Sequence, residues 1–196
     1  MAANLQSLVA EIRACQLCRD DMDRAPNPIL RASTTARILI ASQAPGNLAD
    51  RSGVPFNDPS GRRLRQWMGV TDGEFYDERR VAIAPMGFCF PGYDKNGGDR
   101  PPMKRCAEVW RDKLLSAMPQ IELVLLIGSY SQRWHLGDEA PKTLSETVAR
   151  WTDYLARGMV VTPHPSWRNN AWLKRNPWFE AEVLPVLQRR VRALLS

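Results

Sequence analysis

Arg37-Ile-Leu-Ile-Ala-Ser-Gln-Ala-Pro-Gly46 is an apolar run of strand-forming residues that stops abruptly at a turn-forming segment. Three further apolar runs, at residues 81–84, 123–127 and 159–162, have a similar length and character. Polar residues hardly interrupt these runs, as expected of strands that are covered on both faces. The sequence therefore predicts a sheet of about four short, buried strands.

Helical periodicity fills the intervals between these strands. We expect helices over residues 4–19, 60–67, 102–118, 129–136, 143–156 and 178–195. Ser60 is the expected N-cap of the second helix and Gly69 its stop signal, and the first helix carries Cys15 and Cys18 on its C-terminal end. Strands that alternate with helices pair in parallel through right-handed crossovers. We therefore expect an α/β fold of three α/β/α layers around a short, mainly parallel sheet.

Length and composition indicate one globular domain in water. The chain has 196 residues, of which 44% are hydrophobic and 24% are charged. Its first residues lack the basic and apolar regions of a secretory signal, and no apolar run is long enough to span a membrane. We therefore expect residues 1–196 to form a single cytoplasmic domain without a membrane partner.

An excess of positive charge suits a polyanionic partner such as nucleic acid. The formal net charge is +6, and basic residues gather in two places. One cluster holds Arg62, Arg63 and Arg65, and the other holds Arg168, Lys174 and Arg175. A phosphate-binding surface and a solvated helix face are equally good interpretations of each cluster.

Four cysteines have a spacing that is typical of metal ligands. Cys15 and Cys18 form a Cys-x2-Cys pair, and Cys89 and Cys106 lie far downstream. Disulfides are disfavoured in the cytosol, so bridges are the weaker interpretation. Thiolates in this pattern suit a structural zinc ion or a [4Fe–4S] cluster, which spacing alone does not separate. Four isolated core cysteines are the remaining alternative.

The sequence contains two histidines, of which His164 is the candidate functional one. It follows the expected strand 159–162 and lies between Pro163 and Pro165, which keep it out of a helix. Ligands of parallel sheets bind beyond the carboxyl ends of the strands, where residues 42–46 also lie. By contrast, His135 near the end of an expected helix indicates packing or capping.

Several short motifs then point to a family. Gln43-Ala-Pro-Gly46 is followed by Gly53-Val-Pro-Phe56 and Arg65-Gln-Trp-Met-Gly69, and His164-Pro-Ser-Trp-Arg-Asn169 comes later. In this order they resemble the motifs of the uracil-DNA glycosylase superfamily, over nearly the whole chain. The first two motifs and the cysteine spacing resemble the iron–sulfur (family four) glycosylases, whose pattern is Gly-Glu-Ala-Pro-Gly and then Gly-x-Pro-Phe. The later motifs are also similar to the single-strand-selective monofunctional glycosylases.

The resemblance implies a monofunctional uracil-DNA glycosylase, an N-glycosyl hydrolase that leaves an abasic site for base excision repair. A base inside a duplex is out of reach, so such an enzyme flips the nucleotide into a pocket. The resemblance also implies a monomer that acts on uracil-containing DNA, single- or double-stranded, at the nucleoid. It favours a [4Fe–4S] cluster over structural zinc on Cys15, Cys18, Cys89 and Cys106.

Roles around the pocket follow from the resemblance and from side-chain chemistry. The catalytic candidates are His164, Gln43 and Asp50, with His164 donating a hydrogen bond to O2 of the departing uracil. The candidates for binding the base are Gln43, Ala44, Gly46, Phe56 and Asn57, with the Phe56 ring stacked on it. The candidates for binding DNA are Ser166, Arg168, Asn169, Asn170 and Lys174.

Trp167 or Leu173 would fill the gap that the flipped base leaves. Trp178 indicates packing of the last helix against the sheet, and Trp172 suits either role.

The chain departs from the family-four pattern at three positions. Gln43 stands where that family has glutamate, and Ala49 stands where a downstream carboxylate is expected, with Asp50 next to it. Pro85 replaces the asparagine that reads the uracil edge, a task that the amide of Gln43 or Asn57 can perform. These departures leave two alternatives open. One is a catalytically silent binder of damaged or abasic DNA, and the other is a glycosylase for hypoxanthine or xanthine.

Overall fold

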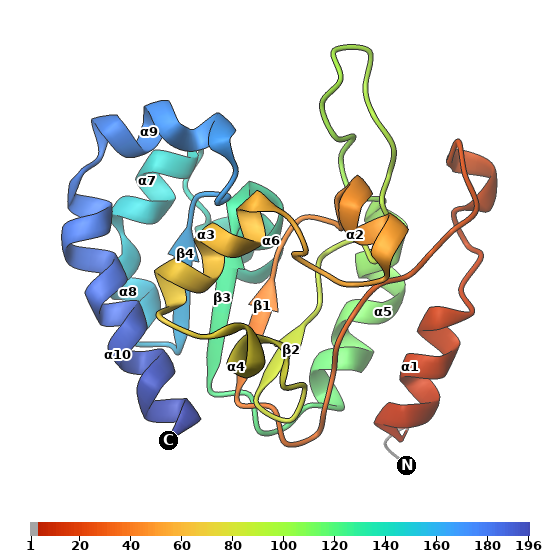
Figure 1. Cartoon of the computed structure of the whole chain (residues 1–196), viewed down its shortest axis with the longest axis horizontal. Coiled ribbons are helices and arrows are strands. Elements are labelled where there is room, and N and C mark those ends of the chain that lie inside the picture. Colours follow the sequence, from red (N-terminus) through yellow and green to blue (C-terminus); the bar gives the residue numbers. More distant parts are fainter. Residues whose placement is uncertain (1–3) are drawn as a thin grey trace.

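The structure, a computed structural model, describes residues 4–196 and is built on a four-stranded parallel sheet (Figure 1). The strands are β1 (Ile38–Ala41), β2 (Val81–Ile83), β3 (Leu123–Ile127) and β4 (Met159–Thr162). Their order is β2-β1-β3-β4, and every neighbouring pair is parallel. The four expected strands are therefore confirmed, with β2 one residue shorter than expected.

Helices cover both faces of this sheet (Figure 1). Ile38 and Ile40 face a core that includes α3 (Pro59–Met68) and α10 (Leu184–Leu195). Leu39 faces the other way, into a core with α1 (Leu5–Arg13) and α5 (Lys104–Ser116). On that second face α6 (Gly128–Leu136) and α8 (Trp151–Leu155) cover β3 and β4. The expected three-layer α/β/α fold is confirmed, and it explains why the strands contain so few polar residues.

The first helix ends earlier than predicted, before the cysteine pair. Its buried positions are Leu5, Leu8 and Ile12, and beyond Ile12 only Cys15 continues this spacing. Backbone turns follow Ala14, and Cys18 precedes the short 3₁₀ helix η1 (Arg19–Asp21). The prediction that a helix over 4–19 carries both cysteines is therefore wrong.

The N-cap of α3 was predicted two residues too late. Asp58, not Ser60, caps this helix, because an Asp58 carboxylate oxygen accepts the Gly61 N–H at 2.8 Å. Pro59 occupies the first turn, where its fixed φ is suited to a helix start. The predicted stop is confirmed, since Gly69 is left-handed with φ 66°.

Other differences concern short helices. The predicted helix 143–156 is divided at Arg150 into α7 (Leu144–Ala149) and α8, and the predicted 178–195 begins as the π-helical turn η4 (Phe179–Val183). Besides η1, the structure adds five short elements that the sequence did not indicate: α2 (Asn47–Ser52), α4 (Asp72–Tyr76), η2 (Gly137–Glu139), η3 (Trp167–Asn169) and α9 (Asn170–Arg175). These span two turns at most, too few for a helical period to show.

Within residues 4–196, each helix is too short or too polar to cross a bilayer.

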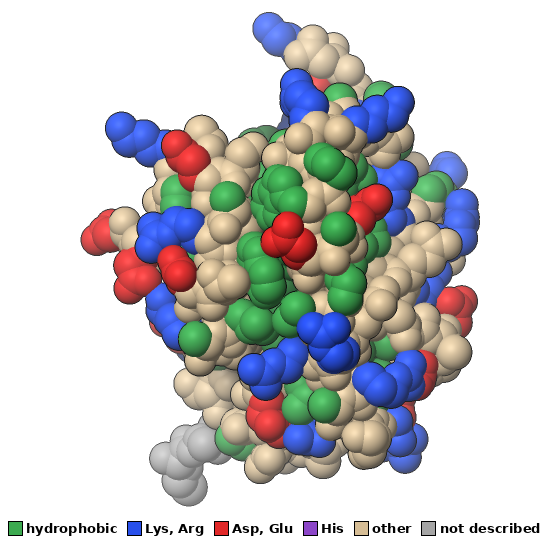
Figure 2. Space-filling model, turned by 90° about the vertical axis from the view of Figure 1, so that its left-hand side faces the viewer, with side chains coloured by type: hydrophobic (Ala, Val, Ile, Leu, Met, Phe, Trp, Pro, Cys, Tyr) green, Lys and Arg blue, Asp and Glu red, His purple; other side chains and the backbone are tan. Residues whose placement is uncertain are grey.

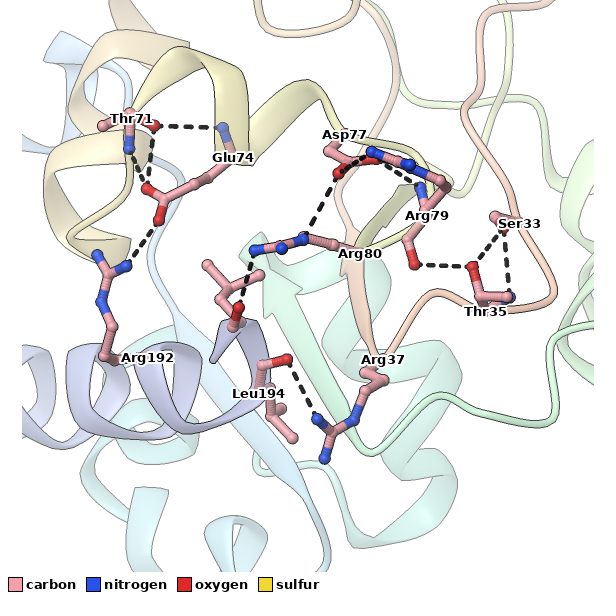
Figure 3. Close-up of polar contacts among 11 residues, drawn as sticks. Ser33, Thr35, Arg37, Thr71, Glu74, Asp77, Arg79, Arg80, Arg192 and Leu194 are labelled. Atoms are coloured by element: carbon pink, nitrogen blue, oxygen red, sulfur yellow. Dashed lines mark hydrogen bonds and ion pairs between the residues drawn. The ribbon is translucent and has the colours of Figure 1, made fainter.

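Polar contacts hold the last helix against the amino ends of the strands (Figure 3). Arg37 and Arg80, which precede β1 and β2, donate to the Leu194 and Leu195 carbonyls at 3.3 and 2.8 Å. These carbonyls have no partner within the helix, so the two guanidinium groups act as its C-terminal cap. Nearby, Arg192 of α10 pairs with Glu74 of α4 at 2.6 Å (Figure 3).

The face over α8, α9 and α10 carries a stripe of hydrophobic side chains between charged ones (Figure 2). These helices contribute partly buried residues that pack on the core, among them Leu155, Leu173 and Leu184. None of these three side chains lines the cavity described next.

Candidate active site

A cavity of about 600 Å³ lies beyond the carboxyl ends of β1, β2 and β4. Residues 42–49, which follow β1, form one wall, and residues 164–169, which follow β4, form another. Pro55, Phe56 and residues 58–60 add a third side. The structure thus brings together the two distant segments that the sequence analysis singled out, as expected for this edge of a parallel sheet.

His164 lies in this cavity as a neutral, half-buried imidazole. Burial, together with the positive charge of Arg168, lowers its pKa below the ordinary value, against the opposing effect of Asp58. The Ser166 backbone N–H donates to Nδ1 at 3.2 Å. A neutral ring that accepts at Nδ1 carries its proton on Nε2. His164 therefore offers an N–H donor from a fixed ring, and the Asn169 amide steadies its carbonyl at 2.7 Å.

Phe56 lines the cavity in a strained backbone conformation. Its φ is 57°, in the left-handed region that bulky residues rarely adopt. Arg65 donates to the Phe56 carbonyl at 3.3 Å, and the Tyr76 hydroxyl donates to the Pro55 carbonyl at 3.1 Å. The ring also packs edge-on against Phe75, with centroids 6.1 Å apart. These contacts fix the ring before any ligand arrives.

Gly61 lets the helix α3 approach this strained turn. A Cβ built on Gly61 would lie 1.8 Å from the Phe56 carbonyl oxygen, much closer than any real contact. Only glycine therefore allows the first turn of α3 to pack against the Phe56 backbone.

The basic cluster at residues 62–65 is not one phosphate-binding surface. Arg65 is buried, at 8% exposure, where it holds the Phe56 turn and pairs with Asp72. Arg63 bridges α3 to the histidine loop by donating to the Ser166 carbonyl and to the Asn170 side chain, at 3.3 and 2.8 Å. Two of the three arginines thus support the site internally, and Arg62 alone among them is exposed.

The candidates from the first motif separate into two groups. Gln43, Ala44 and Gly46 line the cavity, and the Gln43 amide donates to the Arg100 carbonyl at 3.4 Å. Asp50 does not line it, because its carboxylate turns to Arg24 at 2.8 Å.

The remaining candidates lie at or near the mouth of the cavity. Ser166, Arg168 and Asn169 line it, whereas Asn57, Asn170 and Lys174 are exposed outside the lining. Pro85 lines it too, at the position that the resemblance gives to the base-reading asparagine.

The structure distinguishes the tryptophans. Trp167 is 73% exposed at the cavity mouth, whereas Leu173 packs on the core. Trp172 is buried and donates to Ser145 at 2.8 Å, and Trp178 packs beside it, which confirms the packing role predicted for Trp178. Two further exposed side chains, Leu48 and Tyr93, also line the cavity.

Two carboxylates of the cavity were missed from the sequence, Asp58 and Asp99. The Asp-Pro pair at the start of α3 was a signal that could have found Asp58. Asp99 lies in the irregular stretch after Cys89, where no periodic pattern marks a side chain as inward.

The four cysteines form no disulfide, and each of Cys89 and Cys106 lies close enough to Cys15 and Cys18 to feel their charge. Burial raises the pKa of Cys89 to about 12 and that of Cys106 to about 11, and the other cysteines raise both pKa values further. Among residues 4–196, however, no group of three or more His, Cys, Asp or Glu side chains is arranged to hold a metal ion. The metal-ligand set therefore stays a prediction.

A buried Arg111–His135 pair lies next to these cysteines. Arg111 is 1% exposed, donates to the Ala84 carbonyl at 2.5 Å and contacts Nε2 of His135 at 2.8 Å. Burial and the nearby guanidinium lower the pKa of His135 to about 3, so this ring is neutral. His135 therefore packs against Arg111 and does not line the cavity.

Comparison with known families gives one match. The family model described as Uracil DNA glycosylase superfamily matches residues 31–188. The matched range contains all four strands and every segment that lines the cavity, whereas Cys15 and Cys18 lie outside it.

Proposed function

This chain belongs to the uracil DNA glycosylase superfamily, and we propose that it is a monofunctional glycosylase that hydrolyses uracil from DNA. Membership itself implies an N-glycosyl hydrolase that acts on DNA, and uracil is our assignment. The observation that carries it is the pairing of the neutral His164 donor with the rigid Phe56 ring in one cavity.

The proposed reaction begins when the uracil nucleotide leaves the DNA stack and enters the cavity. Phe56 stacks on the base without having to reorganise, because its turn is already fixed. As the N-glycosidic bond breaks, negative charge develops on uracil O2, and Nε2–H of His164 donates to it. A fixed donor of this kind stabilises the transition state by about 3–4 kcal/mol. Water then adds at C1′ and leaves an abasic site.

Gln43 is our candidate for reading the base. Its side-chain amide has a donor and an acceptor, which match the edge of uracil. It lines the cavity, whereas Asn57 is exposed outside the lining. Pro85, which has no side-chain polar group, leaves this task open for the Gln43 amide.

DNA contact is proposed at the mouth of the cavity. Trp167 projects there and would fill the gap that the flipped base leaves. Arg168, Asn169, Asn170 and Lys174 follow it on η3 and α9 and would contact phosphates. We assign single- and double-stranded uracil-containing DNA to the same surface.

We also assign a [4Fe–4S] cluster to Cys15, Cys18, Cys89 and Cys106. Arg111 supports the assignment of an anionic cluster at these cysteines. It is buried beside Cys106, and its Nε has no hydrogen-bond partner. No carboxylate among residues 4–196 forms an ion pair with it. An unpaired buried charge costs several kcal/mol, and the anionic cluster would offset that cost. When bound, the cluster supplies a cross-link between the end of α1, the loop after β2, and α5.

Base release from a set of duplexes tests the function. The purified protein should release uracil from a U·G duplex and leave an alkali-labile site, and His164→Ala should be at least about 100-fold slower. Duplexes with hypoxanthine or xanthine separate the alternative lesions. Binding to abasic DNA with no release from any duplex would instead establish the catalytically silent binder. The ion pair of Asp50 with Arg24 favours this alternative, because it occupies the carboxylate next to the first motif.

A further inference from the structure

The cavity contains two carboxylates, and only one of them is uncommitted. An Asp58 carboxylate oxygen accepts the Gly61 N–H at 2.8 Å as the N-cap of α3. The Asp99 carboxylate forms no hydrogen bond or ion pair with the residues that the structure describes, and only charges at longer range act on it. Asp50, the carboxylate nearest to the first motif in sequence, is paired with Arg24 outside the cavity lining. Asp99 is therefore the free carboxylate of the site.

The loop that carries Asp99 is an ordered hairpin attached to the cavity wall. Tyr93 and Asp99 pair across it as an isolated β-bridge, and Asp94 N–H donates to the Gly98 carbonyl at 2.7 Å. At its base, the Arg100 carbonyl accepts from the Gln43 amide at 3.4 Å. On the other side, Arg168 donates to the Gly97 carbonyl at 3.4 Å. The loop is thus bonded to both motif segments, and Asp99 lines the cavity that they border.

The surroundings of Asp99 favour a proton acceptor. Burial raises its pKa above the ordinary value, and the negative charges of Asp58 and Asp94 raise it further, against the opposing effect of Arg168. Asp99 is exposed at the cavity wall, so water reaches its carboxylate, and a carboxylate with a raised pKa and no bonded partner is a stronger base than an ordinary one.

We propose that Asp99 is the catalytic base that activates the attacking water. This inference rests on the proposed function. The N-glycosidic bond breaks and its electron pair goes to the uracil ring, whose O2 accepts from His164. The water oxygen forms the new bond to C1′, and its proton passes to the Asp99 carboxylate. Asp99 then releases that proton to solvent. The loop would thus supply a carboxylate in place of the two that are expected at the positions of Gln43 and Ala49.

Single-turnover excision of uracil tests Asp99→Asn against Asp138→Asn, a matched change at an exposed carboxylate of η2 that does not line the cavity. Asp99→Asn should lose about 100-fold or more in rate, the usual contribution of a general base. Its melting temperature and DNA affinity should stay unchanged, and Asp99→Glu should recover part of the rate. Asp138→Asn should behave as the wild type does.

The pH profile of the excision rate gives a second measurement, which starts from the wild-type enzyme. The rate should fall in acid with a midpoint above the ordinary aspartate value, because the protonated carboxyl cannot accept a proton. That fall should persist in His164→Gln, which has no ring to protonate, and vanish in Asp99→Asn. An active wild type with neither this fall nor a rate loss in Asp99→Asn overturns the role of Asp99 alone. A wild type that releases no base overturns the proposed function together with it.

Discussion

At His164, a single backbone hydrogen bond selects the ring nitrogen that carries the proton. The Ser166 N–H occupies Nδ1, and burial keeps the ring neutral, so Nε2 is the donor. A neutral donor cannot protonate the leaving uracil outright, but it stabilises the anion without paying for a buried charge.

His164→Ala should therefore slow single-turnover excision by about 10²–10³, since one preorganised donor is lost. DNA affinity should change little, because the exposed basic residues that would meet phosphates lie elsewhere. Because the pKa of His164 is lowered, the ring is already neutral at pH 7. Raising the pH above 7 should therefore not increase the wild-type rate through deprotonation of this histidine. A near-normal rate in His164→Ala would show that the ring is structural.

Gly61 gives a second prediction at this scale. Gly61→Ala places a Cβ 1.8 Å from the Phe56 carbonyl oxygen, so the strained turn must move. We expect a lower melting temperature and a large loss of excision rate. Gly73→Ala is the matched control, since its Cβ would meet nothing nearer than the Thr71 hydroxyl at 4.0 Å. Gly73 lies in α4, and alanine in a helix is more stable than glycine by about 0.5–1 kcal/mol. Equal behaviour of the two variants would contradict the constraint on Phe56.

At the residue scale, the sequence identified functional residues better than it identified the residues that they contact. His164 was identified because prolines and a preceding strand leave a local mark. The role of Gly61 and the place of Asp99 on the cavity wall depend on contacts between segments that are distant in sequence, and no local pattern records such contacts. For the same reason Arg65 was predicted on the surface and is buried.

At the scale of elements, the strands were predictable and the short helices were not. The runs that became β3 and β4 had the predicted ends, because a charged residue, a glycine or a proline bounds each run on either side. Helices α2, α4 and α9 depend on caps and tertiary contacts more than on periodicity. In α4, Thr71 and Glu74 form a reciprocal capping box.

Glu74 supplies a pH test of that cap. The capping bonds with Thr71 and the contact with Arg192 lower its pKa from 4.5 to about 2. A depressed carboxyl pKa contributes stability that is complete above the unfolded value and is lost as pH falls through the folded one. Glu74→Gln should therefore lower the melting temperature at pH 7, and the difference from the wild type should shrink between pH 4.5 and about 2. Since Glu74 forms an ion pair near the surface, added salt should reduce the difference in melting temperature between the wild type and Glu74→Gln. A difference that stays constant with pH would refute the role of the ionised Glu74 carboxylate in this cap.

At the scale of the whole molecule, the proposed cluster and Arg111 act together. The protein, purified without oxygen, should be brown and contain iron and sulfide. Arg111→Met removes a buried positive charge, so the reduced, more negative cluster becomes less stable and its reduction potential should fall. Lys113→Met on the exposed side of α5 is the control and should leave the potential unchanged. Colourless protein with stoichiometric zinc would establish the alternative metal.

Net charge gives a further whole-molecule prediction. DNA affinity should fall steeply with salt, and Arg168→Ala should flatten the log–log slope by about one unit for the phosphate contact that is lost. Arg189→Ala, on an exposed part of α10 away from the cavity, should leave the slope unaltered. Binding that does not depend on salt would argue against phosphate contact at this surface.

The two edges of the sheet have different tasks, and this division bears on how the protein could evolve or be engineered. Arg37 and Arg80 fasten the end of α10 at the amino edge, whereas the cavity is bordered by the loops at the carboxyl edge. Random libraries confined to residues 43–49, 92–98 and 165–169, with His164 and Asp99 kept, would leave that fastening intact. We expect most members of such libraries to remain folded, so that a screen would sort them by the lesion they accept.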